Sequence, residues 1–288
     1  MKIKKKCLIV DGNNLAYRSY YASQNLKWMK ENKEIFIFLK ILISIIKKNK
    51  YDKILFTFDE GKETSRKLAR SDYKCNREKT PRKIIESLTK MKEIVERLGI
   101  KQESNKNYEA DDIIASFIKK NINNDNFEFH IFSQDKDLFQ LISSNVKILR
   151  YKDKKLEIFG EEGFKLENGF SNKYFTYYLA LKGDKIDNIK GIYGIGDKRT
   201  KYIVSKFKNL EDTFSNLNFI PIEIKLLIEN KREEIRKNIE IVSLVENIPL
   251  KVDWKDCEFS WDSIKMNKEF IEFCEIKKMK SIISMIQG

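Results

Sequence analysis

Acidic side chains stand at the ends of apolar runs in this sequence. Asp11 and Asp59 each follow such a run, and Asp135 follows a third run with Ser133 and Gln134 between. Parallel strands end at a common edge of a sheet, and open α/β folds bind their ligands at that edge. We therefore expect these carboxylates to lie close together.

Further acids occur in short groups within one helical turn of each other. One group opens a predicted helix, whose N-terminal dipoles favour anions, and the others lie in polar turns. In chain order these acids are Glu109, Asp111, Asp112, Asp135, Asp137, Asp184 and Asp187. A single aspartate is more often a helix cap or a solvated turn residue than a ligand, so the argument rests on the joint pattern.

Carboxylates drawn to one edge repel each other unless cations lie between them. The chain has one histidine, His130, which lies in a predicted buried strand and is expected to be a core residue. Its 4 cysteines form no Cys-x-x-Cys pair. Oxygen ligands without imidazole or thiolate favour Mg²⁺ or Mn²⁺ over Zn²⁺. Two such ions roughly 3.5–4 Å apart stabilise the attacking and leaving oxygens in phosphodiester hydrolysis.

The charge balance agrees with this chemistry. The chain of 288 residues has 57 lysines and arginines against 43 aspartates and glutamates, a formal net charge of +14. A basic excess of this size suits a polyanionic partner. Acidic ligands within a basic chain suggest a nuclease, in which lysine and arginine hold the nucleic acid beside bound metal ions.

The elements that must position these acids alternate between strands and helices. Short apolar runs predict buried strands, and helical spacing lies between them. This alternation predicts an α/β fold with a parallel sheet covered on both faces, followed by helices after about residue 170. The predicted strands are 7–10, 53–58, 127–132, 146–151 and 155–159, and the predicted helices are 35–47, 84–98 and 111–120.

The sequence offers no sign of a membrane or export segment. The longest apolar run, 35–46, contains Lys40 and is too short to span a bilayer, and the basic N-terminus lacks a signal-peptide cleavage pattern. The scattered cysteines fit reduced thiols. We expect a cytoplasmic protein with no membrane partner.

Four ordered motifs resemble those of the 5′ nucleases, the family of flap endonucleases and of the 5′-3′ exonuclease domain of bacterial DNA polymerase I. They are Asp11-Gly-Asn-Asn-Leu-Ala-Tyr-Arg18, Tyr108-Glu-Ala-Asp-Asp112, Ser133-Gln-Asp-Lys-Asp137 and Gly183-Asp-Lys-Ile-Asp-Asn188. The resemblance extends from the N-terminus to about Val252. It implies a PIN-like nuclease core with a helical arch and a C-terminal helical region that contains a helix-hairpin-helix.

The resemblance also implies the residues of a metal site. Two Mg²⁺ or Mn²⁺ ions would be held by Asp11, Asp59, Glu109, Asp111, Asp112, Asp135, Asp137, Asp184 and Asp187. Lys74 and Arg77 would be the catalytic cations, because they could neutralise the charge that develops on the phosphate.

Contacts with DNA are implied at two places. The basic stretch within 61–90 would form the arch through which a 5′ single strand passes, and the hairpin within 183–207 would bind duplex DNA, with a K⁺ ion on its backbone carbonyls. Glycines allow close approach to phosphate there. The implied DNA-binding residues are Arg18, Arg66, Tyr73, Lys74, Arg77, Gly191, Gly194, Gly196 and Lys198. A solvated surface position for any one cation, or a loop anchor for Tyr73, is an equally good interpretation.

These observations predict a divalent-metal-dependent 5′-3′ exonuclease and flap endonuclease. It would act in replication and repair on DNA with 5′ ends, flaps or nicks, and on RNA primers annealed to DNA. Residues 1–170 would form the nuclease core and 171–288 the helical DNA-binding region. We expect a monomer whose products a separate polymerase and ligase complete, with Trp254 and Trp261 packing a terminal extension.

Two alternatives remain open at this point. A PIN-type ribonuclease shares the acidic sheet edge but does not need the hairpin near Gly194. A catalytically silent branched-DNA-binding protein would keep the DNA contacts, although the complete set of acids argues against it.

Overall fold

The computed structural model describes residues 4–61, 64–123 and 126–288. At its centre lies a six-stranded sheet of order β3-β2-β1-β4-β5-β6. All neighbouring strands are parallel except the edge pair β5 and β6. The strands are β1 (Lys5–Asp11), β2 (Lys53–Asp59), β3 (Lys101–Asn105), β4 (Phe127–Phe132), β5 (Val146–Lys152) and β6 (Lys155–Phe159). The predicted α/β fold with a parallel sheet is confirmed.

Strand β3 is the one strand of this sheet that the apolar runs do not reveal. It is a sheet edge of sequence KQESN, and only its central Glu103 is buried. The Glu103 carboxylate accepts hydrogen bonds from the backbone N–H groups of Lys251 at 2.7 Å and Val252 at 2.8 Å. A polar edge strand has no apolar run in its sequence. It is recognised only from its pairing with β2 in the folded structure.

Two apolar cores lie on opposite faces of the sheet, because successive strand side chains alternate between them. Cys7 and Ile9 of β1 belong to the core that includes α5 (Ala110–Asn121) and α6 (Glu161–Asn168). Leu8 and Val10 belong to the core that includes α1 (Gly12–Ser23), α2 (Lys33–Asn49) and α4 (Arg82–Arg97). No helix within the described ranges, α2 included, is long and apolar enough to cross a membrane.

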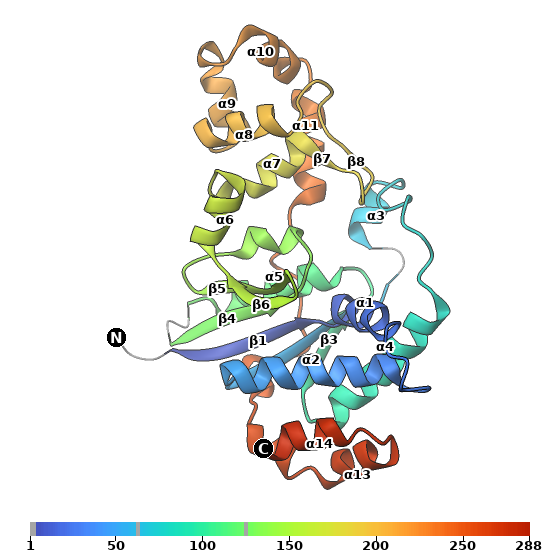
Figure 1. The fold of residues 1–288 in the computed structure, drawn as a ribbon. Helices are drawn as coiled ribbons and strands as arrows, with labels where there is room; N and C mark the ends of the chain where they lie inside the picture. The colour runs from blue at the N-terminus through green and yellow to red at the C-terminus, as the bar shows by residue number, and fades with distance from the viewer. Residues whose placement is uncertain (1–3, 62–63, 124–125) are drawn as a thin grey trace.

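A helical part extends from the α/β core at one end of the molecule (Figure 1). It contains α7 (Phe175–Lys182), the two-stranded hairpin β7 (Gly183–Asp184) and β8 (Ile189–Lys190), α8 (Asp197–Lys206), α9 (Leu210–Ser215), α10 (Ile222–Glu229) and α11 (Arg232–Val242). After α11 the chain returns along the core. The hairpin followed by α8 occupies the expected place of the helix-hairpin-helix.

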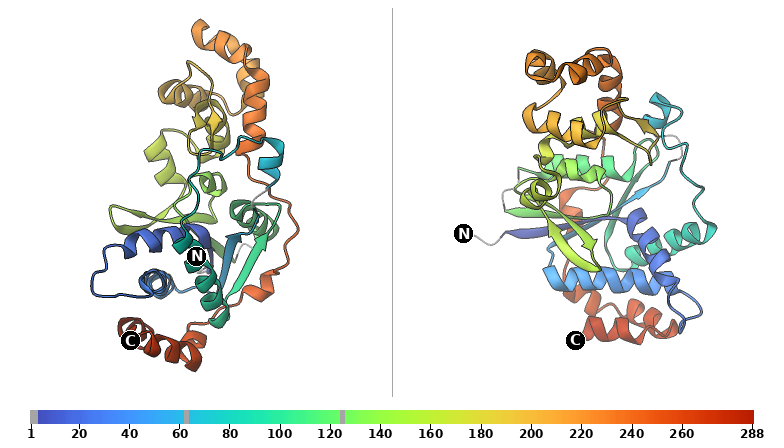
Figure 2. Two further views of the ribbon diagram at one scale, coloured as in Figure 1. Left: turned by 90° about the vertical axis from the view of Figure 1, so that its right-hand side faces the viewer. Right: turned by 45° about the horizontal axis from the view of Figure 1, so that its top comes forward.

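The last helices lie at the opposite end of the molecule, beyond α2 (Figures 1 and 2). They are α12 (Trp261–Lys265), α13 (Lys268–Ile276) and α14 (Lys280–Gln287), and they follow η4 (Trp254–Cys257), which contacts β2. Trp254 packs against Phe127 with ring centroids 4.6 Å apart, and Trp261 packs against the core that contains α2. The expected region 171–288 is therefore not one unit in space, because its last helices bury their apolar faces on the α/β core.

The basic stretch forms little helix. In the expected arch 61–90 the structure has the short α3 (Ser65–Ala69) and the beginning of α4, joined by turns and extended chain through residues 70–81. Residues 62 and 63 lie outside the described residues. In Figure 1 this connection runs along one side of the molecule, from the helical part to α4.

Candidate metal and nucleic-acid site

The carboxyl ends of three strands are tied together by asparagine and serine side chains. Asp11 ends β1, and its carboxylate accepts hydrogen bonds from the Asn14 N–H at 2.9 Å and the Ser133 hydroxyl at 2.9 Å. Asn14 in turn accepts from the Gln134 N–H at 3.1 Å, and Asn13 accepts from the Asp59 N–H at 3.1 Å. These bonds fix the end of β1 relative to β2 and to the loop after β4.

The two asparagines are functional residues that sequence reasoning passed over. They stand inside the first motif, directly after Asp11 and Gly12, which is the signal that could have revealed them. Gly12 itself is required at its place, because a Cβ there would lie 2.2 Å from the ring of Phe58. The motif therefore brings strand ends together as well as supplying an acid.

The N-terminus of α5 brings a second set of acids to the same edge. Asp59 accepts a hydrogen bond from the Ala110 N–H at 2.8 Å, which docks this helix onto β2. Glu109 and Asp112 form a reciprocal capping box around the first turn. Asp111 is held on the same turn, close enough to Asp135 and Asp11 for their charges to act on it.

Part of this acid set lines one cavity of about 370 Å³. Its wall also contains Lys74, Arg77 and Tyr17, whose hydroxyl lies 2.7 Å from that of Thr80. Tyr17 is an aromatic lining residue that sequence reasoning did not single out. The expected acids in the wall are Asp11, Asp59, Glu109, Asp111 and Asp135, and Glu78 of the basic stretch is a further acid there.

The remaining acids continue from this cavity toward the hairpin. The Asp137 N–H donates to Asp135 at 3.0 Å, and the carboxylates of Asp184 and Asp187 are near enough to influence Asp137. Asp187 is 4% exposed. Asp184 accepts a hydrogen bond from the Ile186 N–H at 2.7 Å inside the turn between β7 and β8.

Burial and mutual repulsion disfavour the charged forms of these carboxylates. Burial, followed by repulsion from Asp59, raises the pKa of Asp11 to about 7, against the hydrogen bond from Asn14. Burial and the charge of Asp135 raise the pKa of Asp111 well above its usual value. Burial and the same neighbour raise the pKa of Asp137 to about 8. The cluster is therefore strained in the absence of cations.

Cations of the basic stretch lie against these acids. The Lys74 ammonium is 2.8 Å from Glu109 and 3.9 Å from Asp187, and Arg77 is 2.6 Å from Asp187. Burial lowers the pKa of Lys74, but Glu109 and Asp187 raise it above its usual value. Lys74 and Arg77 therefore stay charged at the rim of the cavity.

The donor set suits hard divalent cations, since it consists of carboxylate oxygens whose negative charge Lys74 and Arg77 compensate only in part. In the part of the chain that the structure describes, no three acidic, histidine or cysteine side chains are arranged around one point as ligands of an ion. The ion pairs with Lys74 and Arg77 account for part of this, because they turn Glu109 and Asp187 toward the basic stretch.

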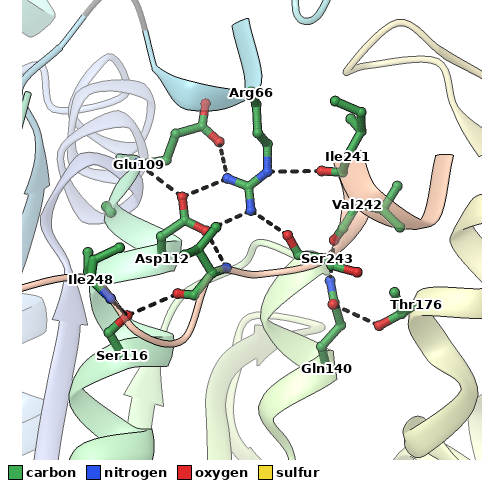
Figure 3. A network of polar contacts seen from close by, with 12 residues as sticks. Arg66, Glu109, Asp112, Ser116, Gln140, Thr176, Ile241, Val242, Ser243 and Ile248 are labelled. Atoms are coloured by element: carbon green, nitrogen blue, oxygen red, sulfur yellow. Dashed lines mark hydrogen bonds and ion pairs between the residues drawn. The ribbon is translucent and has the colours of Figure 1, made fainter. Parts of the chain in front are cut away.

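Asp112 differs from the expectation that it is a metal ligand. It is fully buried, and its two oxygens receive the Arg66 guanidinium at 2.7 and 2.6 Å (Figure 3). It also accepts from the Val245 N–H at 2.9 Å. Because its oxygens are occupied by donors of the protein itself, Asp112 is a structural acid rather than part of the open cluster.

Arg66 and Tyr73 also differ from their expected roles in DNA binding. Arg66 is 6% exposed and all of its donors have partners inside the protein. Tyr73 is 3% exposed, and its hydroxyl, which has one proton to donate, lies 3.2 Å from both the Glu109 and the Asp187 carboxylate. A buried ring offers no face to a base, so Tyr73 anchors the basic stretch to the acids.

The other expected DNA contacts lie on the surface near the site or at the hairpin. Arg18 stacks on the ring of Tyr151 at 3.8 Å from its centroid, and burial lowers its pKa. Gly194 has φ +84 in the turn between β8 and α8, and Gly196 precedes the first turn of α8. Lys198 is exposed on that helix. Free N–H groups at a helix N-terminus are suited to phosphate.

Comparison with known proteins identifies the relatives of this chain. The family described as "5′-3′ exonuclease, N-terminal resolvase-like domain" matches residues 6–169, and "5′-3′ exonuclease, C-terminal SAM fold" matches residues 171–265. A 5′-3′ exonuclease of Aquifex aeolicus is 30% identical over 98% of this chain and 96% of its own length. One of Mycoplasmopsis pulmonis is 32% identical over 93% of this chain and 89% of its own length.

Longer relatives contain the same region as one part. DNA polymerase I of Borreliella burgdorferi is 34% identical over 85% of this chain, which spans 27% of that protein. Among solved structures, a bacteriophage T5 D15 flap endonuclease in complex with DNA and metal ions is 21% identical with a TM-score of 0.71, covering 99% of this chain and 100% of that one. The catalytic core of Rad2 with DNA substrate is 16% identical with a TM-score of 0.61, covering 99% of this chain and 93% of that one. At these identities the solved structures support the fold.

Proposed function

Since this chain belongs to the 5′-3′ exonuclease family, we propose that it removes nucleotides and flaps from the 5′ ends of DNA, and RNA primers annealed to DNA, in replication and repair. The observation that carries the proposal is the cavity in which acids from separate strands and a helix meet, with Lys74 and Arg77 at its rim. Acids and cations in one cavity match the needs of phosphodiester hydrolysis, in which negative charge develops on a bound polyanion.

We propose that Mg²⁺ or Mn²⁺ ions bind these carboxylates. Asp11, Asp59, Glu109, Asp111 and Asp135 would hold one ion in the cavity, and Asp137, Asp184 and Asp187 would hold a second. The raised pKa values support this, because a divalent cation favours the charged carboxylates against the burial and the mutual repulsion that raise their pKa. When bound, such ions activate a water molecule and stabilise the leaving oxygen.

Lys74 and Arg77 are proposed as the cations that stabilise charge on the phosphate. They now pair with Glu109 and Asp187, two acids that bound metal ions would also attract. A phosphate that enters the cavity would give Lys74 and Arg77 a second anion to pair with at the same rim. Loss of one such donor costs roughly 100- to 1000-fold in rate in other hydrolases.

Duplex DNA is proposed to bind at the hairpin of Gly191, Gly194 and Gly196 and at the first turn of α8, with Lys198 beside it and Arg18 nearer the cavity. The family assignment of residues 171–265 as a SAM fold supports a binding role for this part. A K⁺ ion on the hairpin carbonyls belongs to the same proposal. The backbone there turns through the positive φ of Gly194, whose carbonyl accepts a hydrogen bond from Arg199 at 2.6 Å.

The setting of the reaction is also a proposal. The match to stand-alone exonucleases supports a monomer that hands its product to a separate polymerase and ligase. Its cysteines form no disulfide among the described residues, which fits work in the cytoplasm on cellular DNA.

Cleavage of defined substrates tests the function. A 5′-flap duplex, a nicked duplex and a single-stranded RNA are incubated with Mg²⁺, Mn²⁺ or EDTA, with wild type, Asp135→Asn and Lys74→Ala. We expect 5′ products from the flap and the nick with either metal, none in EDTA, and a loss of roughly 100-fold or more in both variants. Lys120→Ala is the matched control, because Lys120 pairs with Asp253 away from the cavity. Cleavage in EDTA, or preference for the RNA, would contradict the proposal.

A further inference from the structure

Arg66 is a buried arginine in which every N–H group has a partner within the protein (Figure 3). Its Nε donates to the Ile241 carbonyl at 2.9 Å. Nη1 donates to Glu109 at 3.2 Å and to Asp112 at 2.7 Å. Nη2 donates to Asp112 at 2.6 Å and to the Ser243 carbonyl at 2.7 Å. Since a guanidinium has five donors, none remains for a phosphate.

Arg66 and its partners belong to three separate parts of the fold. Arg66 lies in α3, in the basic stretch. Glu109 and Asp112 open α5, which carries acids of the cavity. Ile241 and Ser243 lie at the C-terminal end of α11, where the chain leaves the helical part. Helix ends leave carbonyl groups without helical partners, and Arg66 supplies donors to them.

The same returning segment is fastened to the core at further points (Figure 3). The Val242 carbonyl accepts from the Gln140 amide at 2.9 Å. Ser116 of α5 donates to the Val245 carbonyl at 3.0 Å and accepts from the Ile248 N–H at 3.2 Å. The segment after α11 therefore has a fixed path against α5. Arg66 adds the charged hydrogen bonds between this segment and α5.

Arg66 also decides how Glu109 is presented to the cavity. Its Nη1 holds one oxygen of Glu109, and the other oxygen faces Lys74 at 2.8 Å. A planar guanidinium fixes both position and direction of its acceptors, which an ammonium group does not. A small displacement of a reacting group costs as much as 100-fold in rate, so the orientation of Glu109 matters for catalysis.

We infer that Arg66 is a positioning residue that holds the acid cavity and the end of α11 in one arrangement. It acts through Glu109 and Asp112 and does not touch the substrate. This inference rests on the proposed function, because it concerns the same cavity. It predicts that loss of the guanidinium damages metal binding and turnover and leaves the affinity for DNA nearly unchanged.

The test compares two variants that treat the buried charge differently. Arg66→Lys keeps the charge but loses the fork of donors. Arg66→Met combined with Asp112→Asn removes both charges, so that no buried ion is left unpaired if the single variant fails to fold. Arg150→Lys is the matched control, because Arg150 is also mostly buried and pairs with Glu157 and Glu167 away from the cavity.

Each protein is studied well below its own melting temperature. The measurements are Mn²⁺ binding by calorimetry without DNA, flap affinity in Ca²⁺ at several salt concentrations, and kcat and KM for flap cleavage. We expect both Arg66 variants to bind Mn²⁺ more weakly and to lose roughly 10- to 100-fold in kcat. Flap affinity and its salt dependence should stay close to wild type, and Arg150→Lys should match wild type throughout.

Each alternative has its own outcome. Wild-type Mn²⁺ affinity and kcat in variants that merely melt earlier would show a structural role and overturn the inference. Weaker flap binding with a salt slope reduced by about one would show that Arg66 contacts a phosphate, which also overturns it. If wild type does not cleave the flap, the proposed function fails, and Mn²⁺ binding still decides whether Arg66 positions the acids.

Discussion

At the scale of single residues, the carboxylates of the cavity repel each other and pair with lysine and arginine side chains of the same chain. Asp137 illustrates this balance. Its carboxylate has no hydrogen-bond donor among the described residues, and burial with the nearby charge of Asp135 raises its pKa to about 8. The folded protein therefore holds a proton on this group more tightly than the unfolded chain does. Ionising it without a cation nearby costs folding free energy.

The pH dependence of metal-free stability should show this cost. For Asp137 the folded pKa lies above the unfolded value near 3.8, so its destabilising effect is absent below about pH 4 and grows as pH rises to about 8. In EDTA at pH 8, the free energy of unfolding of Asp137→Asn should exceed that of wild type by on the order of 2 kcal/mol, and the variant should melt at a higher temperature. Both differences should shrink toward pH 4. Thermal melts across this range provide the measurement. A lower melting temperature for the variant at pH 8 would mean that Asp137 stabilises the fold.

At the scale of elements, the hairpin of β7 and β8 depends on two glycines that face each other. Gly183 has φ +76, and a Cβ on it would lie 2.2 Å from the Gly191 nitrogen. A Cβ on Gly191 would lie 2.0 Å from the Lys182 carbonyl oxygen. The strands can approach this closely only without side chains, and their approach places Asp184 and Asp187 beside the cavity.

Substitution of one hairpin glycine should separate the strands. Gly191→Ala must push backbone atoms apart, so we expect a loss of roughly 1–3 kcal/mol in stability and weaker duplex binding. Gly196→Ala is the control for stability alone, because a Cβ there meets nothing within 4 Å. Its melting temperature should equal that of wild type. Urea unfolding and duplex titration measure the two effects, and equal stability of both variants would contradict the importance of the close approach.

At the scale of the whole molecule, the C-terminal helices form part of the nuclease core although they follow the helical part in sequence. Ile282 and Ile286 of α14 and Phe270 of α13 are fully buried in the core that contains α2. Lys47 of α2 donates to the Met285 carbonyl at 2.8 Å. The chain thus runs from the core to the helical part and back, so that its last helices cover α2 at the end away from the hairpin.

This arrangement predicts that the C-terminal helices serve stability rather than catalysis. Ile282→Ala should lower the free energy of unfolding by about 2–5 kcal/mol, because it leaves a cavity beside α2. Flap cleavage at a temperature well below melting should be unchanged. Ile276→Ala is the control, since Ile276 is 67% exposed. Chemical denaturation and cleavage rates decide the matter, and reduced cleavage by folded Ile282→Ala would show that this end communicates with the cavity.

The sequence by itself determined the α/β order, the strands that end in Asp11 and Asp59, and the oxygen chemistry of the acid set, because apolar runs and residue types are local properties of the chain. Tertiary structure alone decided that Arg66 and Tyr73 are buried anchors and that Asp112 is closed to a metal. It also decided that β3 is a strand and that the last helices return to α2. Each of these depends on partners more than 30 residues away, and burial of a charge or a ring follows from what packs around it rather than from its type.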